Sequence, residues 1–204
     1  MNQKHQEDLA HIRSMMERSS RFISLSGLSG VFAGLSALVG GLYAYQLFGS
    51  NGISYMDGAS YQQNNNLVHK LMVTATVVLL LALTFGIFFT LRKSKRYSLP
   101  IWTSATKSML FNLAIPLIVG GIFCFALLCY KIYFLIAPTM LLFYGLALIN
   151  AEKYTFSDVK YLGYCQLILG CISLFYLDYG LIFWIVGFGI LHILYGLVMF
   201  KKYK

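Results

Sequence analysis

Residues 71–91 read LMVTATVVLLLALTFGIFFTL, and residues 92–96, which follow directly, read RKSKR. The first segment has no charged residue, and at about 1.5 Å of helical rise per residue it is long enough to cross a hydrocarbon core of roughly 30 Å. An apolar run of this length that ends in a basic cluster is typical of a transmembrane helix whose basic end lies in the cytoplasm.

Five further segments have the same apolar character. They cover residues 22–48, 108–130, 132–150, 159–177 and 181–200. Together with 71–91 they predict an all-α, polytopic membrane protein, a bundle of six transmembrane helices over 22–204 preceded by a tail at 1–21. The composition agrees, because 11% of the 204 residues are charged whereas a soluble domain carries about a quarter. The sequence therefore excludes a soluble enzyme and a DNA-binding domain.

The basic residues predict an orientation. Of the 16 Lys and Arg residues, only Lys70 and Lys131 fall on the side opposite the N-terminus. The others are Lys4, Arg13, Arg18, Arg21, Arg92, Lys93, Lys95, Arg96, Lys107, Lys153, Lys160, Lys201, Lys202 and Lys204. By the positive-inside rule we expect both termini in the cytoplasm. Anionic lipid at the cytoplasmic face accounts for these charges, so we expect no nucleic-acid partner.

The tail at 1–21 has the pattern of a short amphipathic helix. Its apolar residues recur at spacings of 3, 4 and 7, at Leu9, Ile12, Met16 and Ile23, and charged residues occupy the other positions. Such a helix lies on the inner membrane surface, extends the first span into the cytoplasm, or docks a cytoplasmic protein partner.

Small residues form a stripe along the first predicted span. They follow one another at steps of three or four, at Gly27, Gly30, Gly34, Ala37, Gly41 and Ala44. In lipid such a stripe lets two helix backbones approach closely, and Ser29 and Ser36 can bond across the contact or back onto their own helix. The contact lies either within the bundle or at the seam of a homo-oligomer.

Few strongly polar residues lie inside the predicted spans. His192 is near the midpoint of the last span, Gln166 near that of the fifth, and Asn112 in the third. Tyr144, Tyr164 and Tyr195 are candidates to join them in one intramembrane polar cluster. The cluster is either a neutral imidazole held by Gln or Tyr, or a proton-linked or ligand-binding site. The spans contain no deep Asp or Glu, which argues against a carboxylate relay and a carboxylate-bound metal.

We predict no catalytic residue, no metal site and no cofactor. A haem bundle usually offers two inward histidines, and here the spans offer His192 alone. The cysteines are Cys124, Cys129, Cys165 and Cys171, and none forms a Cys-x-x-Cys pair, so we interpret them as packing residues.

Two prolines fall within neighbouring spans. Pro116 lies in the third and Pro138 in the fourth, and we expect a kink at each. Such kinks are either structural or, as in transporters, part of a substrate site near the midplane.

Residues 11–30, HIRSMMERSSRFISLSGLSG, resemble the start of a group of uncharacterised bacterial six-helix membrane proteins. The resemblance is concentrated in the tail and first span and implies that this junction is distinctive of the group. It implies that the bundle lies in the inner membrane of a bacterium, and it implies no activity and no functional residues.

Three functions are compatible with these features. The one we favour is a non-catalytic component that senses or docks through its N-terminal tail. The alternative is a permease or pore for a small neutral or weakly basic solute, with His192, Gln166 and Asn112 along the path. The third, an intramembrane enzyme, would need a nucleophile or an acid/base pair.

Overall fold

The computed structural model describes residues 26–57, 64–98 and 100–203, so the predicted tail at 1–21 lies outside the described residues. Within them the chain folds into helices. The helices are α2 (Gly27–Asn51), α4 (Asn65–Arg96), α5 (Ser104–Cys129), α6 (Ile136–Ala151) and α7 (Val159–Phe175), followed by a last crossing made of α8 (Gly180–Trp184), the π-helical segment η4 (Ile185–Leu191) and α9 (His192–Lys202).

The predicted all-helical bundle is confirmed. Of the described helices, five are long and apolar enough to cross a membrane, and α7, with 17 residues, is the shorter sixth. The helix α4 runs further than the predicted 71–91 at both ends. At its start the Asn64 side chain accepts a hydrogen bond from the Leu67 N–H at 3.0 Å, which caps the helix in the polar connection. At its end Lys93, Lys95 and Arg96 occupy the last turn, where cations are favoured by the helix dipole.

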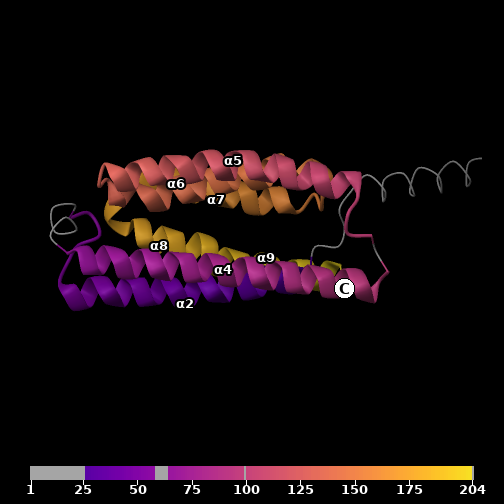
Figure 1. Ribbon diagram of the computed structural model, residues 1–204, viewed down its shortest axis with the longest axis horizontal. Helices are drawn as coiled ribbons and strands as arrows, with labels where there is room; N and C mark the ends of the chain where they lie inside the picture. Colours follow the sequence, from indigo (N-terminus) through magenta and orange to yellow (C-terminus); the bar gives the residue numbers. More distant parts are fainter. Residues whose placement is uncertain (1–25, 58–63, 99, 204) are drawn as a thin grey trace, which may run out of the picture.

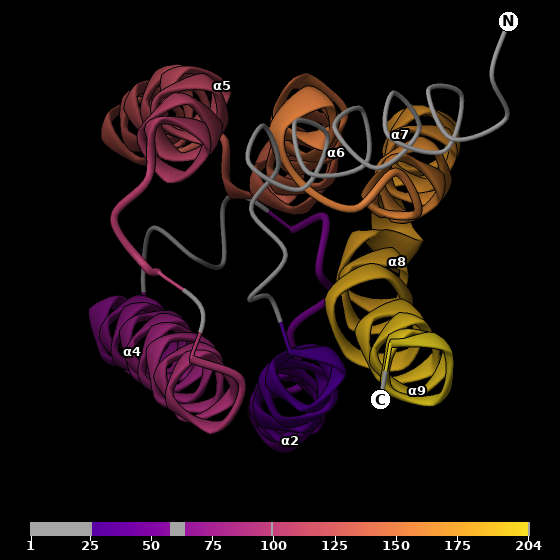
Figure 2. The same ribbon diagram turned by 90° about the vertical axis from the view of Figure 1, so that its right-hand side faces the viewer.

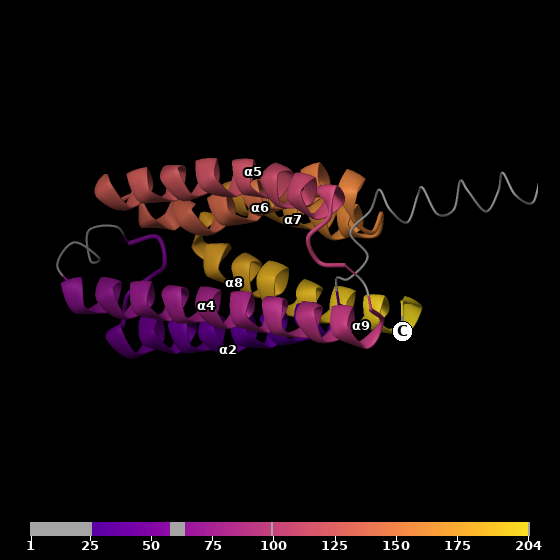
Figure 3. The same ribbon diagram turned by 45° about the vertical axis from the view of Figure 1, so that its right-hand side comes forward.

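The helices form two layers (Figures 1 and 2). One layer contains α5, α6 and α7, with α6 packed between the other two. The second contains α4, α2 and α9, with α2 in the middle. The last crossing joins the layers, because α8 packs against α6 and α7 whereas η4 and α9 pack along α2 (Figure 3). We call the end of the bundle with residues 92–96 and 201–202 the basic end, and the opposite end the loop end.

The predicted stripe of small residues on α2 faces the last crossing of the same chain. A Cβ atom added at Gly34 would lie 2.7 Å from the Gly189 carbonyl oxygen, and one added at Gly196 would lie 2.5 Å from the Val31 nitrogen. The contact is therefore backbone against backbone and leaves no room for a side chain. Ala37, Gly41 and Ala44 continue the same buried face. We call this contact the α2–α9 seam.

The two serines near the stripe bond back onto their own helix. The Ser36 hydroxyl donates to the Phe32 carbonyl at 2.9 Å, and the Ser29 hydroxyl donates to the Ser26 carbonyl. The seam therefore depends on close packing of backbones, and neither serine's described hydrogen bond crosses it.

A second glycine contact, which the sequence analysis did not single out, joins α6 to α7. A Cβ atom at Gly145 would lie 2.8 Å from the Gly163 carbonyl oxygen, and one at Gly163 would lie 3.0 Å from the Gly145 oxygen. Gly163 and Gly170 are seven residues apart and share the inward face of α7 with Gln166. Close approach of α6 and α7 brings the polar residues of both helices within reach of each other.

Both prolines lie within described helices. The helix α5 continues on both sides of Pro116. Pro138 is the third residue of α6, in the first turn, where backbone N–H groups have no partner within their helix, so proline is well tolerated there. A departure from α-helical geometry occurs at η4, which contains no proline.

The α2–α9 seam predicts a specific sensitivity to added methyl groups. We expect Gly34→Ala to lower the unfolding free energy by about 1–3 kcal/mol, because the new Cβ overpacks against the backbone of the last crossing. The matched control is Gly86→Ala on α4, where a Cβ meets no atom within 4 Å, and removing a helical glycine there should be neutral or stabilising. Unfolding of both variants in mixed detergent micelles measures the difference. Equal effects at the two positions would contradict a close-packed seam.

Candidate functional site

Three helices bring polar side chains together between the two layers. Tyr144 comes from α6, Gln166 from α7 and His192 from the first residue of α9, and all three meet near the Gly187 carbonyl in η4. His192 is 6% exposed and Gln166 is fully buried. We call these four residues the His192 cluster. The sequence pattern predicts Tyr144, Gln166 and His192 in this cluster, whereas Gly187 participates only through its backbone carbonyl.

The hydrogen bonds fix the tautomer of His192. Its Nδ1 lies 2.9 Å from the Gly187 carbonyl oxygen, which can only accept, so Nδ1 carries the proton and donates. The neutral ring then accepts at Nε2 from the Tyr144 hydroxyl, 2.8 Å away. Both ring nitrogens are thus satisfied by protein groups.

Gln166 is oriented by the same carbonyl. Its Nε2 donates to the Gly187 oxygen at 2.8 Å, and the reverse orientation of the amide would place two acceptors against each other. The 3.5 Å separation between Gln166 Nε2 and His192 Nδ1 joins two donors and is no hydrogen bond once the tautomer is assigned. The Gly187 carbonyl therefore accepts from two side chains on two different helices.

The shared acceptor belongs to a π-helical turn. Such a turn is wider than an α-helical turn and rearranges the backbone bonding, and such segments recur at functional sites. A Cβ atom at position 187 would meet the Leu141 side chain and lie 2.6 Å from Gln166 Oε1, so it would force both side chains to shift. The packing of the cluster therefore depends on Gly187 having no side chain.

Aromatic rings surround the imidazole. The ring centroid of Phe188 lies 5.8 Å from that of His192 in a stacked arrangement, and 5.1 Å from that of Tyr144. The Trp184 ring follows, 5.2 Å from Phe188. Because His192 and Gln166 are buried beside these rings, the hydrogen bonds of the His192 cluster lie in a largely apolar environment, where an unsatisfied polar group is costly.

Three buried polar atoms have no hydrogen-bond partner among the described residues. They are Gln166 Oε1, Ser173 Oγ and the Tyr195 hydroxyl. Ser173 shares the inward face of α7 with Gln166, seven residues away, and Tyr195 lies three residues after His192. Unpaired buried atoms are rare in native proteins and mark places where a water or a ligand atom can bind.

Three residues expected in the cluster take no part in its hydrogen bonds. Tyr195 packs against the apolar group around Leu148 and Met199. The Asn112 side-chain amide donates to the Ser108 carbonyl of its own helix at 2.8 Å, and the Asn112 backbone carbonyl accepts from the Asn150 side chain at 2.8 Å, so Asn112 forms part of the contact between α5 and α6. Tyr164 is 47% exposed on the outer surface of α7. The rotation of each helix against its neighbours, which composition does not specify, accounts for the difference.

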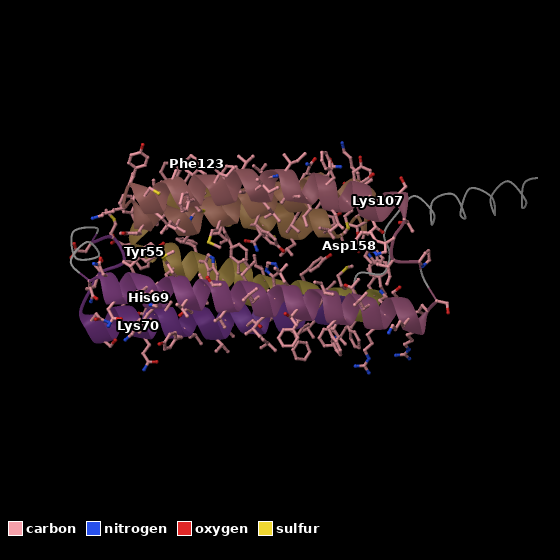
Figure 4. All side chains as sticks on the ribbon, in the orientation of Figure 1. Tyr55, His69, Lys70, Lys107, Phe123 and Asp158 are labelled. Carbon is pink, nitrogen blue, oxygen red and sulfur yellow. The ribbon has the colours of Figure 1, made fainter. Side chains whose placement is uncertain are left out.

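A second polar group, missed by the sequence analysis, closes the basic end. The Lys202 Nζ donates to both carboxylate oxygens of Asp158, at 2.8 and 3.0 Å, and the Tyr203 hydroxyl donates to the same carboxylate at 2.7 Å. The Lys202 hydrogen bond lowers the pKa of Asp158 below its ordinary value, so the carboxylate stays ionised. Figure 4 shows Asp158 at this end of the bundle.

This group also reaches α4. The Phe156 ring lies 4.1 Å from that of Tyr203, and Lys93 Nζ lies 5.4 Å above the Phe156 ring while donating to the Tyr203 carbonyl at 3.4 Å. The end of α4, the α6–α7 connection and the end of α9 are thereby held together. In the part of the chain that the structure describes, no three His, Cys, Asp or Glu side chains converge as they would around a metal ion.

No protein-family model, no curated protein and no solved structure matches this chain. Its candidate site is therefore defined by geometry alone.

The His192 cluster predicts a stability effect that a matched pair of variants isolates. We expect Tyr144→Phe to lower the unfolding free energy by about 1 kcal/mol, because His192 Nε2 loses its donor in an apolar environment. The control, Tyr164→Phe, removes the same atom from an exposed ring and should have no effect beyond about 0.5 kcal/mol.

A double variant completes this test. In His192→Phe the Tyr144 hydroxyl is left unpaired, so adding Tyr144→Phe to it should cost less than Tyr144→Phe alone. Unfolding in mixed detergent micelles gives all four free energies, and strict additivity would contradict the hydrogen bond.

Proposed function

We propose that this protein is a non-catalytic, multi-pass membrane component that senses or docks through the segment preceding α2. The observation that carries the proposal is the α2–α9 seam. Because the backbones of α2 and the last crossing are in contact at Gly34 and Gly189, a displacement of α2 must move the last crossing with it. A partner bound to the segment before Gly27 would therefore be mechanically connected to the His192 cluster.

The hydrogen bonds of the His192 cluster favour a non-catalytic function over an enzymatic one. Both ring nitrogens of His192 are occupied by protein groups, which suits a joint between helices better than a nucleophile or a general base. The π-helical turn beside it is a place where a helix can change register, as two-state elements in membrane proteins require.

The proposed location is the inner membrane of a bacterium, with both termini in the cytoplasm. Its support is the gathering of basic residues at one end of the bundle, at the end of α4, the start of α5 and the end of α9. Among the Lys and Arg residues of the described ranges, only Lys70 and Lys131 lie at the other end. With that orientation the segment before α2 faces the cytoplasm, where a soluble partner would meet it.

A permease for a small neutral or weakly basic solute is the second candidate. The observation in its favour is the trio of unpaired buried atoms, Gln166 Oε1, Ser173 Oγ and the Tyr195 hydroxyl, which lie along α7 and α9 on both sides of His192. A solute that donates and accepts hydrogen bonds would satisfy them in turn.

One pair of measurements separates the two candidates. Removal of residues 2–20 should leave a folded bundle that no longer co-purifies with a cytoplasmic protein captured by the full chain after cross-linking in intact cells. The full chain in proteoliposomes should show no solute flux above that of protein-free vesicles. An unchanged set of cross-linked partners after the deletion would contradict docking. Flux that falls in both His192→Ala and Gln166→Ala, but not in Tyr164→Phe, would establish the permease instead.

A further inference from the structure

A groove runs along the surface of the bundle between α2 and α4. It has a volume of about 490 Å³ and extends from Phe32 to Tyr43 on α2 and from Val73 to Phe85 on α4. Its walls are open to the surroundings, since Val39 is 67% exposed. Such a groove in a membrane-spanning bundle opens toward the lipid rather than toward water.

The lining of the groove consists mostly of apolar side chains, and the hydroxyl groups of its serine and threonine are bonded within their own helices. Two of its polar side chains, Ser36 and Thr74, donate their hydroxyl hydrogens to carbonyl groups of their own helices, at 2.9 Å to Phe32 and 2.8 Å to Lys70. These hydroxyls are therefore not available to recruit a polar ligand. The occupant that suits the lining is a hydrocarbon chain.

The length of the groove matches one leaflet of a bilayer. Val73 and Phe85 are 12 positions apart, which corresponds to about 18 Å of helix, and one leaflet contributes about half of a hydrocarbon core of roughly 30 Å. Phenylalanine rings mark the inner end, where the ring centroid of Phe32 lies 5.2 Å from that of Phe85, in a tilted arrangement, and 4.9 Å from that of Phe89, in a stacked one. Most of the groove lies in the leaflet at the loop end, because Val73 is eight positions and Phe85 four positions from residue 81, the midpoint of the predicted span 71–91.

Cationic and polar side chains stand at the outer end of the groove. His69 and Lys70 precede the lining residues Val73 and Thr74 by four positions each, so they lie on the same face one turn closer to the loop end. Figure 4 shows both at that end of α4. Both are exposed, and the first turn of α4 carries no acidic residue that would neutralise them. Tyr43 contributes a phenol from α2, as residues at a membrane interface often do.

We propose that this groove binds one acyl chain of an anionic phospholipid from the leaflet at the loop end, with the lipid phosphate beside Lys70. The chain would lie against Val39 and Val77 and end at the stacked phenylalanine rings. Lys70 would select the headgroup by its charge, because a lysine near the membrane surface attracts anionic lipid. The site lies on α2, the helix that also forms the α2–α9 seam.

The test uses the full chain in lipid nanodiscs with a phosphatidylglycerol that carries a photoactivatable group on one acyl chain. The matching phosphatidylcholine serves as the neutral comparison. After illumination, mass spectrometry of peptides locates the adducts. We expect the adducts to concentrate on the groove residues of α2 and α4 and to be more abundant with phosphatidylglycerol.

Matched variants separate a site from ordinary lipid contact. Val77→Trp fills the groove and should lower the groove adducts about tenfold, the effect of displacing roughly two methylene groups. Val119→Trp, at an equally exposed position of α5, should leave them unchanged, since Val77 is 48% and Val119 49% exposed. Lys70→Gln should lower the preference for phosphatidylglycerol roughly fivefold, whereas Lys131→Gln, at the other basic residue of the loop end, should not.

Three results would overturn the proposal. Adducts spread evenly over α4 and α5 would indicate a bulk lipid shell without a site. Equal labelling by the two lipids would remove the role of Lys70. Adducts or cross-links that join two copies of the chain through groove residues would assign the groove to a second copy instead.

Discussion

The carbonyl oxygen of Gly187 is the point on which the arrangement of the last crossing depends. In hydrocarbon every backbone polar group needs a partner inside the protein, and here one carbonyl accepts from His192 and from Gln166 at 2.9 and 2.8 Å. These two bonds hold the π-helical segment against α7, and the bond from Tyr144 to His192 holds it against α6. The last crossing is therefore fixed to one layer by hydrogen bonds and to the other by the glycine contacts of the α2–α9 seam.

These two kinds of contact differ in what disturbs them. The seam depends on the absence of side chains and responds to added volume, whereas the His192 cluster depends on pairing of polar atoms and responds to the loss of a donor or an acceptor. A helix held by both can move only if both rearrange together. This coupling is the physical basis of our proposal that binding at α2, whether by a protein partner or by a lipid in its groove, reaches the centre of the bundle.

The sequence predicted the helices well because apolar length and charge are local properties. It placed the stripe from Gly27 to Ala44 correctly on a helix contact, and it selected His192, Gln166 and Tyr144 because polar residues are rare in the spans. It did not predict that Gly187 would supply the shared acceptor. Every residue has a backbone carbonyl, and the sequence does not show which one accepts hydrogen bonds from side chains. Nor did it separate Asn112 and Tyr164 from the cluster, since that depends on the rotation of each helix against its neighbours.

The central claim is that His192 is neutral and that protein groups occupy both of its ring nitrogens. The nitrogen NMR shifts of its ring in the ¹⁵N-labelled full chain in bilayers test this claim most directly. The account predicts one protonated nitrogen, Nδ1, and one unprotonated nitrogen, Nε2, that accepts a hydrogen bond, with the Nδ1 proton resistant to exchange with deuterated water. A ring protonated at Nε2, or one whose proton exchanges rapidly with solvent, would contradict it.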